Sequence, residues 1–427
     1  MNIKLVATNI ILPLGARVLQ ITGSKSETNR LLLLQALYPN LTIENTSNSD
    51  DSEVMAKALS TACQTELVEV HHAGTAMRFL TAFFAIQENR EVVLTGSSRM
   101  KERPIKILVD ALRQLGAEIT YELNEGFPPI RIIGKKLIQN KVSLYADVSS
   151  QYISALLLIA PKLENGIELT LIGEITSIPY IKMTLSLLNE IGVETSFVGN
   201  LISVKPLVTP SMSSRAQSRD EGPNPKSLIV ESDWSSASYY YSIVALSEIG
   251  TSITLSSYKK NSLQGDSVLV EIYKKLGVET KYNSDNSISI SKLFNIQPKT
   301  INLNLNNAPD IAQTIAVTCF GLGLDCHLEG LQTLKIKETD RLEALKNELE
   351  KLGAKVSTTD ESLTLVSTGI LRSNIKIKTY QDHRMAMAFA PLAVKTEIVI
   401  EDAAVVSKSY PDFWNDLKKI GFIIEKR

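Results

Sequence analysis

The sequence predicts an α/β protein built from six repeated units, grouped into two domains. Three observations predict this fold: six short motifs that open apolar helices, glycines that recur at intervals of 68 to 85 residues after a second helix, and β-rich stretches between the helices. One such unit cannot bury both of its helices, so several units must share a core. A Ser-, Pro- and charge-rich stretch at 210–227 interrupts the third unit and favours two domains over three.

The first helix of each unit follows a motif that carries a cation, a hydroxyl or an acid. The run after the first motif, LLLLQALY, is almost wholly apolar, as in a buried helix. Thr75 and Thr339 are expected helix caps, and Pro104 is expected in the first turn of a helix. The expected openings lie at 25–30, 75–78, 149–151, 233–236, 309–310 and 382–384.

Second helices are expected before Gly116, Gly192, Gly277, Gly353 and Gly421, because glycine suits the left-handed residue after a helix. The first unit lacks this glycine, and its second helix is expected at 52–62. Strands are expected where β-rich runs are bounded by turn residues: in the first 16 residues and at 91–96, 130–134, 167–173, 251–257, 363–368 and 397–402.

Composition excludes several classes of protein. The chain is 44% hydrophobic and 21% charged with a net charge of -1, so it has no basic excess that would favour nucleic acid. No apolar run approaches the roughly 18 to 20 residues that span a bilayer. A cytoplasmic protein is expected, with no membrane or nucleic-acid partner.

Signals for a metal or a cofactor are absent or weak. Cys63, Cys319 and Cys326 form no CxxC pair, and their odd number argues against a disulfide framework. Cys326 and His327 are expected to fill the core. No complete GxxxxGK[ST] motif occurs, and GLG at 321–323 lacks the third glycine of a dinucleotide fingerprint. We therefore expect neither a metal nor a cofactor.

Most of the cations at the helix openings oppose the helix dipole, at a cost of about 0.3–1 kcal/mol each if exposed. A bound anion would satisfy both the amides and the side chains. Any single motif is equally consistent with a solvated surface helix, and Glu338 and Arg341 are spaced for an i, i+3 ion pair. If the helix openings of both domains share one cleft, eight cations converge with Asp310 and Glu338: Lys25, Arg30, Arg78, Arg103, Lys337, Arg341, Arg384 and Lys408.

These motifs, taken together, resemble one family over essentially the whole chain. GSKSETNR, AGTAMR, RMKERP, SSQY, SIPY, APD, KETDR, DHRMAMA and SKSYPD occur in the order typical of 5-enolpyruvylshikimate-3-phosphate synthases (3-phosphoshikimate 1-carboxyvinyltransferases). The resemblance implies two lobes, each of three βαβαββ repeats, in an inside-out α/β barrel. One lobe would contain 1–20 and 229–427, and the other 21–228. It also implies a monomer without cofactors.

The activity that the resemblance implies is a step of the shikimate pathway, toward chorismate and the aromatic amino acids. The enolpyruvyl group of phosphoenolpyruvate passes to the 5-hydroxyl of shikimate 3-phosphate, and phosphate is released. Asp310 would be the base for the hydroxyl, Glu338 the proton donor and acceptor at the methylene carbon, and Lys25 a proton donor toward the bridging or leaving oxygen.

The resemblance also implies the binding residues. Shikimate 3-phosphate would be held by Lys25, Ser26, Arg30, Ser149, Ser150, Gln151, Ser177, Asp310 and Lys337, with Tyr180 nearby. Phosphoenolpyruvate would be held by Lys25, Gly74, Arg103, Gln151, Arg341, Arg384 and Lys408.

Two positions depart from the family pattern: His72 and Thr333 stand where asparagine is frequent. The insertion at 210–227 also departs from it. Two alternatives stay open: a UDP-N-acetylglucosamine enolpyruvyl transferase, which typically has Lys-Asn where this chain has Lys25-Ser26 and a loop cysteine that this chain lacks, and a catalytically silent relative that binds anions.

Overall fold

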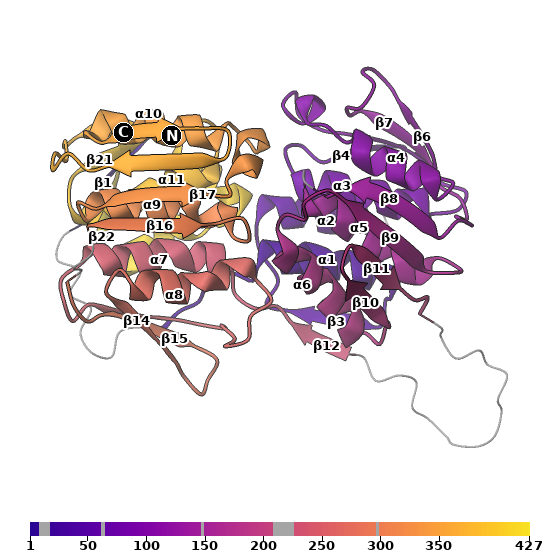
Figure 1. The fold of residues 1–427 in the computed structure, drawn as a ribbon, viewed down its shortest axis with the longest axis horizontal. Helices are drawn as coiled ribbons and strands as arrows, with labels where there is room; N and C mark the ends of the chain where they lie inside the picture. Colours follow the sequence, from indigo (N-terminus) through magenta and orange to yellow (C-terminus); the bar gives the residue numbers. More distant parts are fainter. Residues whose placement is uncertain (8–17, 61–64, 147–148, 208–225, 296–298) are drawn as a thin grey trace. The chain divides into compact units, whose positions relative to one another are not determined.

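The computed structural model describes residues 1–7, 18–60, 65–146, 149–207, 226–295 and 299–427, and these form two compact units. Unit 1 comprises Met1–Ser24 and Glu231–Arg427, and unit 2 comprises Lys25–Val230 (Figure 1). Cys63 and most of the 210–227 stretch lie outside the described residues. No helix in the described part of the chain is long and apolar enough to cross a membrane.

Unit 2 alternates helices and strands along the chain. Its α-helices are α1 (Lys25–Leu37), α2 (Asp50–Leu59), α3 (Gly74–Ala85), α4 (Lys106–Gln114), α5 (Ser150–Ile159) and α6 (Ile178–Glu190), with 3-10 helices η1 (Met100–Glu102) and η2 (Ala160–Lys162). Its strands are β3 (Leu41–Glu44), β4 (Leu67–Glu69), β5 (Glu91–Thr95), β6 (Glu118–Tyr121), β7 (Ile130–Ile133), β8 (Lys141–Tyr145), β9 (Ile167–Ile172), β10 (Thr195–Val198), β11 (Leu201–Val204) and β12 (Lys226–Ile229).

Unit 1 has the same alternation. Its α-helices are α7 (Trp234–Leu246), α8 (Leu269–Lys274), α9 (Ala312–Gly321), α10 (Arg341–Leu352), α11 (His383–Phe389) and α12 (Phe413–Lys419). Its 3-10 helices are η3 (Gly265–Val268), η4 (Pro309–Ile311), η5 (Gln332–Ile336), η6 (Ala390–Val394) and η7 (Ala403–Lys408). Its strands are β1 (Ile3–Ala7), β2 (Val18–Leu19), β13 (Ser252–Leu255), β14 (Val278–Tyr282), β15 (Ile288–Lys292), β16 (Thr300–Asn304), β17 (Asp325–Glu329), β18 (Lys355–Thr358), β19 (Ser362–Val366), β20 (Ile375–Ile377), β21 (Ile398–Ile400) and β22 (Phe422–Lys426).

Five four-stranded sheets share one topology, a parallel pair followed by two antiparallel pairs. In the sheet β4-β5-β7-β6, β4 is parallel to β5, and β7 is antiparallel to both β5 and β6. The sheets β8-β9-β11-β10, β2-β13-β15-β14, β16-β17-β19-β18 and β20-β21-β1-β22 repeat this pattern. In the described residues the sixth sheet is the parallel pair β3-β12. The predicted α/β repeats are confirmed.

The strand β1 completes the last sheet of unit 1. It lies antiparallel between β21 and β22, in the position that β7 occupies in its own sheet. The amide of Arg427 donates to the carbonyl of Asn2 across 2.9 Å, so the two ends of the chain are neighbours, as Figure 1 shows.

The two short strands next to the chain crossings between the units each pair within their own unit. β2 leads into α1 of unit 2, yet it pairs with β13 of unit 1, Val18 opposite Thr254. β12 leads into α7 of unit 1, yet it pairs with β3 of unit 2, Lys226 opposite Leu41. Unit 1 is therefore built from two separate segments of the chain, and unit 2 from one.

The first helices of the repeats form the cores. All residues of α3 and α9 are buried except Gly321 at the end of α9, and α7 and α11 are nearly as enclosed. In unit 1, α9 contacts both α7 and α11, and in unit 2, α3 contacts both α1 and α5. Helices that are apolar on all sides must be covered on all sides, and here separate sheets and the second helices cover them. The first helices thus lie inside each unit, with the strands and the second helices around them and without one closed barrel of strands among the described residues.

The five glycines expected after second helices all have positive φ, from 83° at Gly277 to 119° at Gly353. At Gly277 an added Cβ would also lie 2.3 Å from the carbonyl oxygen of Phe294, so a side chain cannot fit there. These predictions are confirmed.

Several predicted helix starts were wrong by one or two residues. α2 spans Asp50–Leu59 instead of 52–62, because Ser49 caps it by accepting from the Ser52 amide. α3 begins at Gly74, with Ala73 and not Thr75 at the cap position. Asp340, not Thr339, caps α10 by accepting from two backbone amides, and α4 begins at Lys106, after Pro104. At α10 the carboxylate of Asp340 accepts the first free amides better than the Thr339 hydroxyl one residue earlier.

Candidate active site

Three cations surround one carboxylate in unit 1. Asp310 lies in η4, just before α9, and its Oδ1 accepts from Arg341 Nη1 at 2.9 Å and pairs with Lys337 Nζ at 3.4 Å. Its Oδ2 lies 3.4 Å from Arg384 Nη2. The structure thus brings together Asp310, Lys337, Arg341 and Arg384, which the sequence places up to 74 residues apart.

Arg341, the first residue of α10, is held on three sides. Its Nη2 donates to Glu338 Oε2 at 2.7 Å, the i, i+3 pair that the spacing predicted. Its Nε donates to Asp382 Oδ2 at 2.6 Å. Its side chain is 2% exposed, so these carboxylates and not solvent neutralise a guanidinium placed at the positive end of a helix.

Burial and the close packing of these charges together lower the pKa values of Asp310 and Lys337 and raise that of Arg341. Burial would raise the pKa of Asp310, but Arg384, Lys337 and Arg341 together bring it well below its usual range. Burial lowers the pKa of Lys337, which Asp310 only partly offsets. Burial also opposes the charge on Arg341, yet Asp382, Glu338 and Asp310 raise its pKa. Asp310 is therefore a carboxylate and a hydrogen-bond acceptor at neutral pH.

Arg384 and Lys408 occupy neighbouring loops of the same unit. Arg384 Nη1 donates to the backbone carbonyl of Asp310 at 3.0 Å. Lys408, the last residue of η7, donates to the carbonyl of Gln381 at 2.7 Å, next to the Asp382 that caps α11. Six predicted site residues of unit 1 are thus linked by direct contacts or lie within one residue of such a contact: Asp310, Lys337, Glu338, Arg341, Arg384 and Lys408.

In unit 2, Lys25 is the first residue of α1. Its Nζ donates to Asp51 Oδ2 at 3.1 Å, and Asp51 belongs to the first turn of α2. Nearby, Ser52 donates to the Asn29 side chain at 2.9 Å, so the openings of α1 and α2 are tied together.

Arg30 connects three helices of unit 2. Its Nε donates to Thr184 Oγ1 in α6 at 2.8 Å, its Nη2 to Ser154 Oγ in α5 at 2.9 Å, and its Nη1 to the carbonyl of Ser26 at 2.7 Å. It is 2% exposed, and burial lowers its pKa to about 10. Tyr180 accepts from it through its carbonyl at 3.4 Å and lies close to Ser177, the residue before α6, whose φ is 54°.

Gly74 makes room for two guanidinium groups. A Cβ at this position would stand 2.6 Å from Arg103 Nη1 and 3.0 Å from Arg78 Nη1. Arg78 donates to the carbonyls of Gly74 and Pro104, and Tyr152 donates to the same Pro104 carbonyl at 2.7 Å. At the opening of α3 two arginines therefore lie close to the backbone, and a side chain at position 74 would have to displace a guanidinium.

The opening of α5 adjoins that of α3. Ser149 caps α5 by accepting from the Gln151 amide, and Ser150 is the first helical residue. The Gln151 side chain donates to Thr75 Oγ1 across 3.2 Å, a residue 76 positions earlier. The predicted residues of unit 2 thus sit in or beside the first two turns of α1, α3, α5 and α6, except Arg103, which follows η1.

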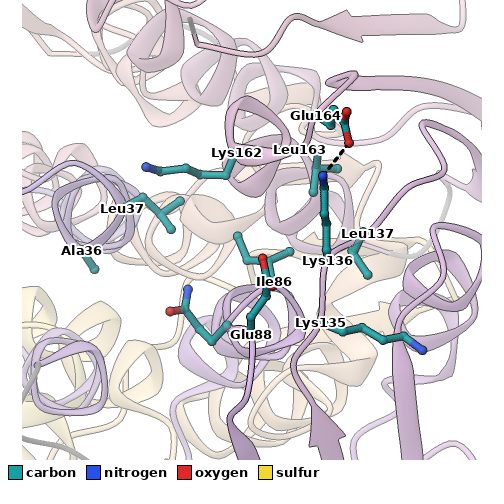
Figure 2. Close-up of a pocket in the computed structure, with 11 residues that line it drawn as sticks. Ala36, Leu37, Ile86, Glu88, Lys135, Lys136, Leu137, Lys162, Leu163 and Glu164 are labelled. Atoms are coloured by element: carbon teal, nitrogen blue, oxygen red, sulfur yellow. Dashed lines mark ion pairs between the residues drawn. The ribbon is translucent and has the colours of Figure 1, made fainter. Parts of the chain in front are cut away.

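A hollow of about 540 Å³ in unit 2 involves none of the predicted residues (Figure 2). It is lined by residues from the ends of α1 and α3, roughly 20 Å along these helices from their openings. Its lysines diverge: Lys136 pairs with Glu164 at 2.8 Å, Lys135 with Glu118 at 3.3 Å, and Lys162 lies 4.4 Å from the ring centroid of Tyr38. It lacks the convergence of cations seen around Asp310.

Thr333, Cys326 and His327 lie outside the group of charged residues around Asp310. Thr333 lies in η5, and its hydroxyl forms no hydrogen bond within the described residues. Cys326 is buried as predicted, but the prediction that His327 fills the core was wrong: its side chain is 37% exposed and contacts Thr364 at 2.7 Å and Glu329 at 3.1 Å. Among the residues that the structure describes, no three His, Cys, Asp or Glu side chains are grouped as metal ligands would be.

Sequence reasoning gave no role to two carboxylates that the structure places against site cations, Asp51 beside Lys25 and Asp382 beside Arg341. Asp382 was noted as the acid of a helix opening, and that capping signal is confirmed. Its partner, 41 residues earlier, carries no local signal.

The chain is similar to known proteins over most of its length. Residues 60–417 match the family model EPSP synthase (3-phosphoshikimate 1-carboxyvinyltransferase). The chain is 44% identical over 414 residues to the 3-phosphoshikimate 1-carboxyvinyltransferase of Bacteroides fragilis, covering 95% of this chain and 96% of that protein. It is 35% identical over 431 residues to the enzyme of the same name from Haemophilus influenzae, covering 94% and 96%.

Solved structures share the fold. EPSP synthase from Acinetobacter baumannii superposes with a TM-score of 0.74 at 19% identity, covering 100% of both chains. The enolpyruvyl transferase NikO from Streptomyces tendae has a TM-score of 0.68 at 13% identity, covering 99% of this chain and 98% of that one. On the family match and the identity to its relatives, the chain belongs to the EPSP synthase (3-phosphoshikimate 1-carboxyvinyltransferase) family.

Proposed function

We propose that this protein is a 3-phosphoshikimate 1-carboxyvinyltransferase, which transfers the enolpyruvyl group of phosphoenolpyruvate to the 5-hydroxyl of shikimate 3-phosphate and releases phosphate. Membership of the family supports this activity. The observation that carries it is the group around Asp310: three cations suited to anionic substrates, with an ionised acid at their centre and Glu338 beside Arg341.

The mechanism that follows is an addition and an elimination. Asp310 removes the proton of the 5-hydroxyl as its oxygen attacks C2 of phosphoenolpyruvate, while Glu338 protonates the methylene carbon. Glu338 then takes a proton back from that carbon as phosphate leaves, and Lys25 donates a proton toward the leaving oxygen. The arginines stabilise charge and do not exchange protons.

The low pKa makes Asp310 a weak base as long as no substrate anion is bound to the three cations that surround it. Phosphoenolpyruvate would bring its own negative charge to Arg341 and Arg384, so less of their field would act on Asp310 and its pKa would rise. Substrate binding would thus strengthen the base at the moment that it is needed.

The binding roles of the residues in unit 2 are also proposals. Lys25, Ser26, Arg30, Ser149, Ser150, Gln151, Ser177 and Tyr180 would contact shikimate 3-phosphate, and Gly74 and Arg103 would contact phosphoenolpyruvate. Most of these residues lie at helix openings, where free backbone amides favour anions. Arg30 lies in the second turn of α1, and Arg103 directly follows η1. The protein would act in the cytoplasm as a monomer, without a nucleic-acid partner, and light scattering of the purified chain tests the monomer.

A phosphate-release assay tests the activity. We expect release from phosphoenolpyruvate with shikimate 3-phosphate as the acceptor and none with UDP-N-acetylglucosamine. The reverse preference would favour the alternative transferase. Binding of both substrates by calorimetry without any turnover would favour the silent relative.

A further inference from the structure

Arg384 is hydrogen-bonded to Ser235, and Ser235 to Asp266, and the proposed mechanism uses neither of these two residues. Arg384 Nη2 donates to Ser235 Oγ at 3.3 Å, and the Ser235 hydroxyl donates to Asp266 Oδ2. Ser235 lies in the first turn of α7, and Asp266 lies in η3, a separate element. Arg384 is thus tied to α7 through one nitrogen and to the Asp310 carbonyl through the other.

The direction of the hydrogen bonds from Arg384 to Ser235 and from Ser235 to Asp266 depends on the charge of Asp266. An ionised carboxylate can only accept, so the Ser235 hydrogen must point toward Asp266. The lone pairs of the Ser235 oxygen are then turned toward Arg384. Without the carboxylate the hydroxyl rotates freely, and its hydrogen can point at the guanidinium instead of accepting from it.

The burial of Asp266 lowers the stability of the folded protein. It is 2% exposed, and its Oδ1 accepts no hydrogen bond within the described residues. Burial raises its pKa to about 6; Arg384 and the Ser235 hydroxyl lower it, while Asp310 and Asp233 raise it. A buried carboxylate satisfied on one oxygen costs stability, so folding does not explain its presence.

We propose that Ser235 and Asp266 are positioning residues that aim Arg384 at an anionic group of phosphoenolpyruvate. This rests on the proposed function. A guanidinium holds a carboxylate or a phosphate in a bidentate manner when its plane is correctly oriented, and a long side chain loses entropy when it is oriented only on binding. Anchoring two nitrogens before the substrate arrives removes part of that cost.

The first test is Ser235→Ala, assayed by phosphate release. We expect the KM for phosphoenolpyruvate to rise about tenfold, within the range for losing a hydrogen bond to a charged group, while the KM for shikimate 3-phosphate changes by less than about twofold. Ser235→Thr keeps the hydroxyl and should restore most of the affinity. The matched control is Ser242→Ala, which removes a buried hydroxyl from the same helix, where it accepts from Thr318 at 2.7 Å.

The second test is the pH dependence of Asp266→Asn. Below about pH 6 the protonated Asp266 of the wild type becomes a donor and releases the Ser235 hydroxyl, so the KM for phosphoenolpyruvate should rise as the pH falls. The amide side chain of the variant cannot titrate. The ratio of the wild-type KM to the variant KM should therefore increase as the pH is lowered from about 7 to about 5.5, and titration of the substrate phosphate cancels in this ratio.

Three results would overturn the inference: an unchanged KM for phosphoenolpyruvate in Ser235→Ala, equal rises for both substrates together with an equal effect of Ser242→Ala, or a KM ratio that does not depend on pH. Absence of turnover in the wild-type protein would instead contradict the proposed function. Because the inference rests on that function, it would then be rejected as well.

Discussion

Arg341 and Asp382 form an ion pair that is almost wholly removed from solvent, with Nε 2.6 Å from Oδ2 and side-chain exposures of 2% and 0%. Asp382 also accepts from the Arg384 amide at 2.8 Å and so caps α11. One carboxylate therefore orients Arg341 through its side chain and Arg384 through its backbone.

We predict that Asp382→Ala is strongly destabilising, by about 3 to 5 kcal/mol, because it removes the most buried of the three carboxylates that pair with the Arg341 guanidinium and leaves a helix without its cap. Thermal unfolding measures the loss. Asp340→Ala is the control, because it removes the cap of α10 but no buried pair, and it should cost about 1 kcal/mol. Equal losses in the two variants would contradict the role given to the pair.

We predict that Asp310→Asn and Glu338→Gln lower kcat by about 10² to 10⁴, since each removes a proton-transfer group. The affinity for shikimate 3-phosphate, measured by calorimetry, should fall far less. Turnover at the wild-type rate in both variants would rule out the proposed roles.

Gly74→Ala should raise the KM for phosphoenolpyruvate, by about tenfold, because the new methyl group would stand 2.6 Å from Arg103 Nη1 and push that guanidinium aside. A double-mutant cycle with Arg103→Lys supplies the control, since a lysine has no Nη1 to displace. The effects of Gly74→Ala and Arg103→Lys should be less than additive. Full additivity would place the effect of the methyl group elsewhere.

The stability of Asp266→Asn relative to the wild type should depend on pH. The pKa of Asp266 is raised from 3.8 to about 6, so ionising it costs the folded protein stability. This cost is absent below about pH 4 and fully present above about pH 6, where a shift of two pKa units is worth about 3 kcal/mol. The variant should therefore gain in Tm over the wild type as the pH rises from about 4 to about 7. A difference in Tm that is constant with pH would contradict the shifted pKa.

Short-range patterns in the sequence predicted the repeated elements well. Glycines after second helices, apolar first helices and the i, i+3 pair of Glu338 and Arg341 are set by neighbours within one or two turns, so they can be recognised locally. Helix starts were missed by one or two residues where two capping side chains stand close together, as Thr339 and Asp340 do. The cations around Asp310 were recognised as a set only because their motifs recur.

By itself, then, the sequence determined the α/β repeats, the residues at each helix opening and the family. The tertiary structure alone decided that β1 lies between β21 and β22, that β2 pairs with β13 and β12 with β3, and that Asp382 and Asp266 stand behind Arg341 and Arg384. The physical reason is that strand pairing and buried charge compensation join residues separated by tens to hundreds of positions. Such partners are selected by packing and by the exclusion of water, which leave no periodic mark on the chain.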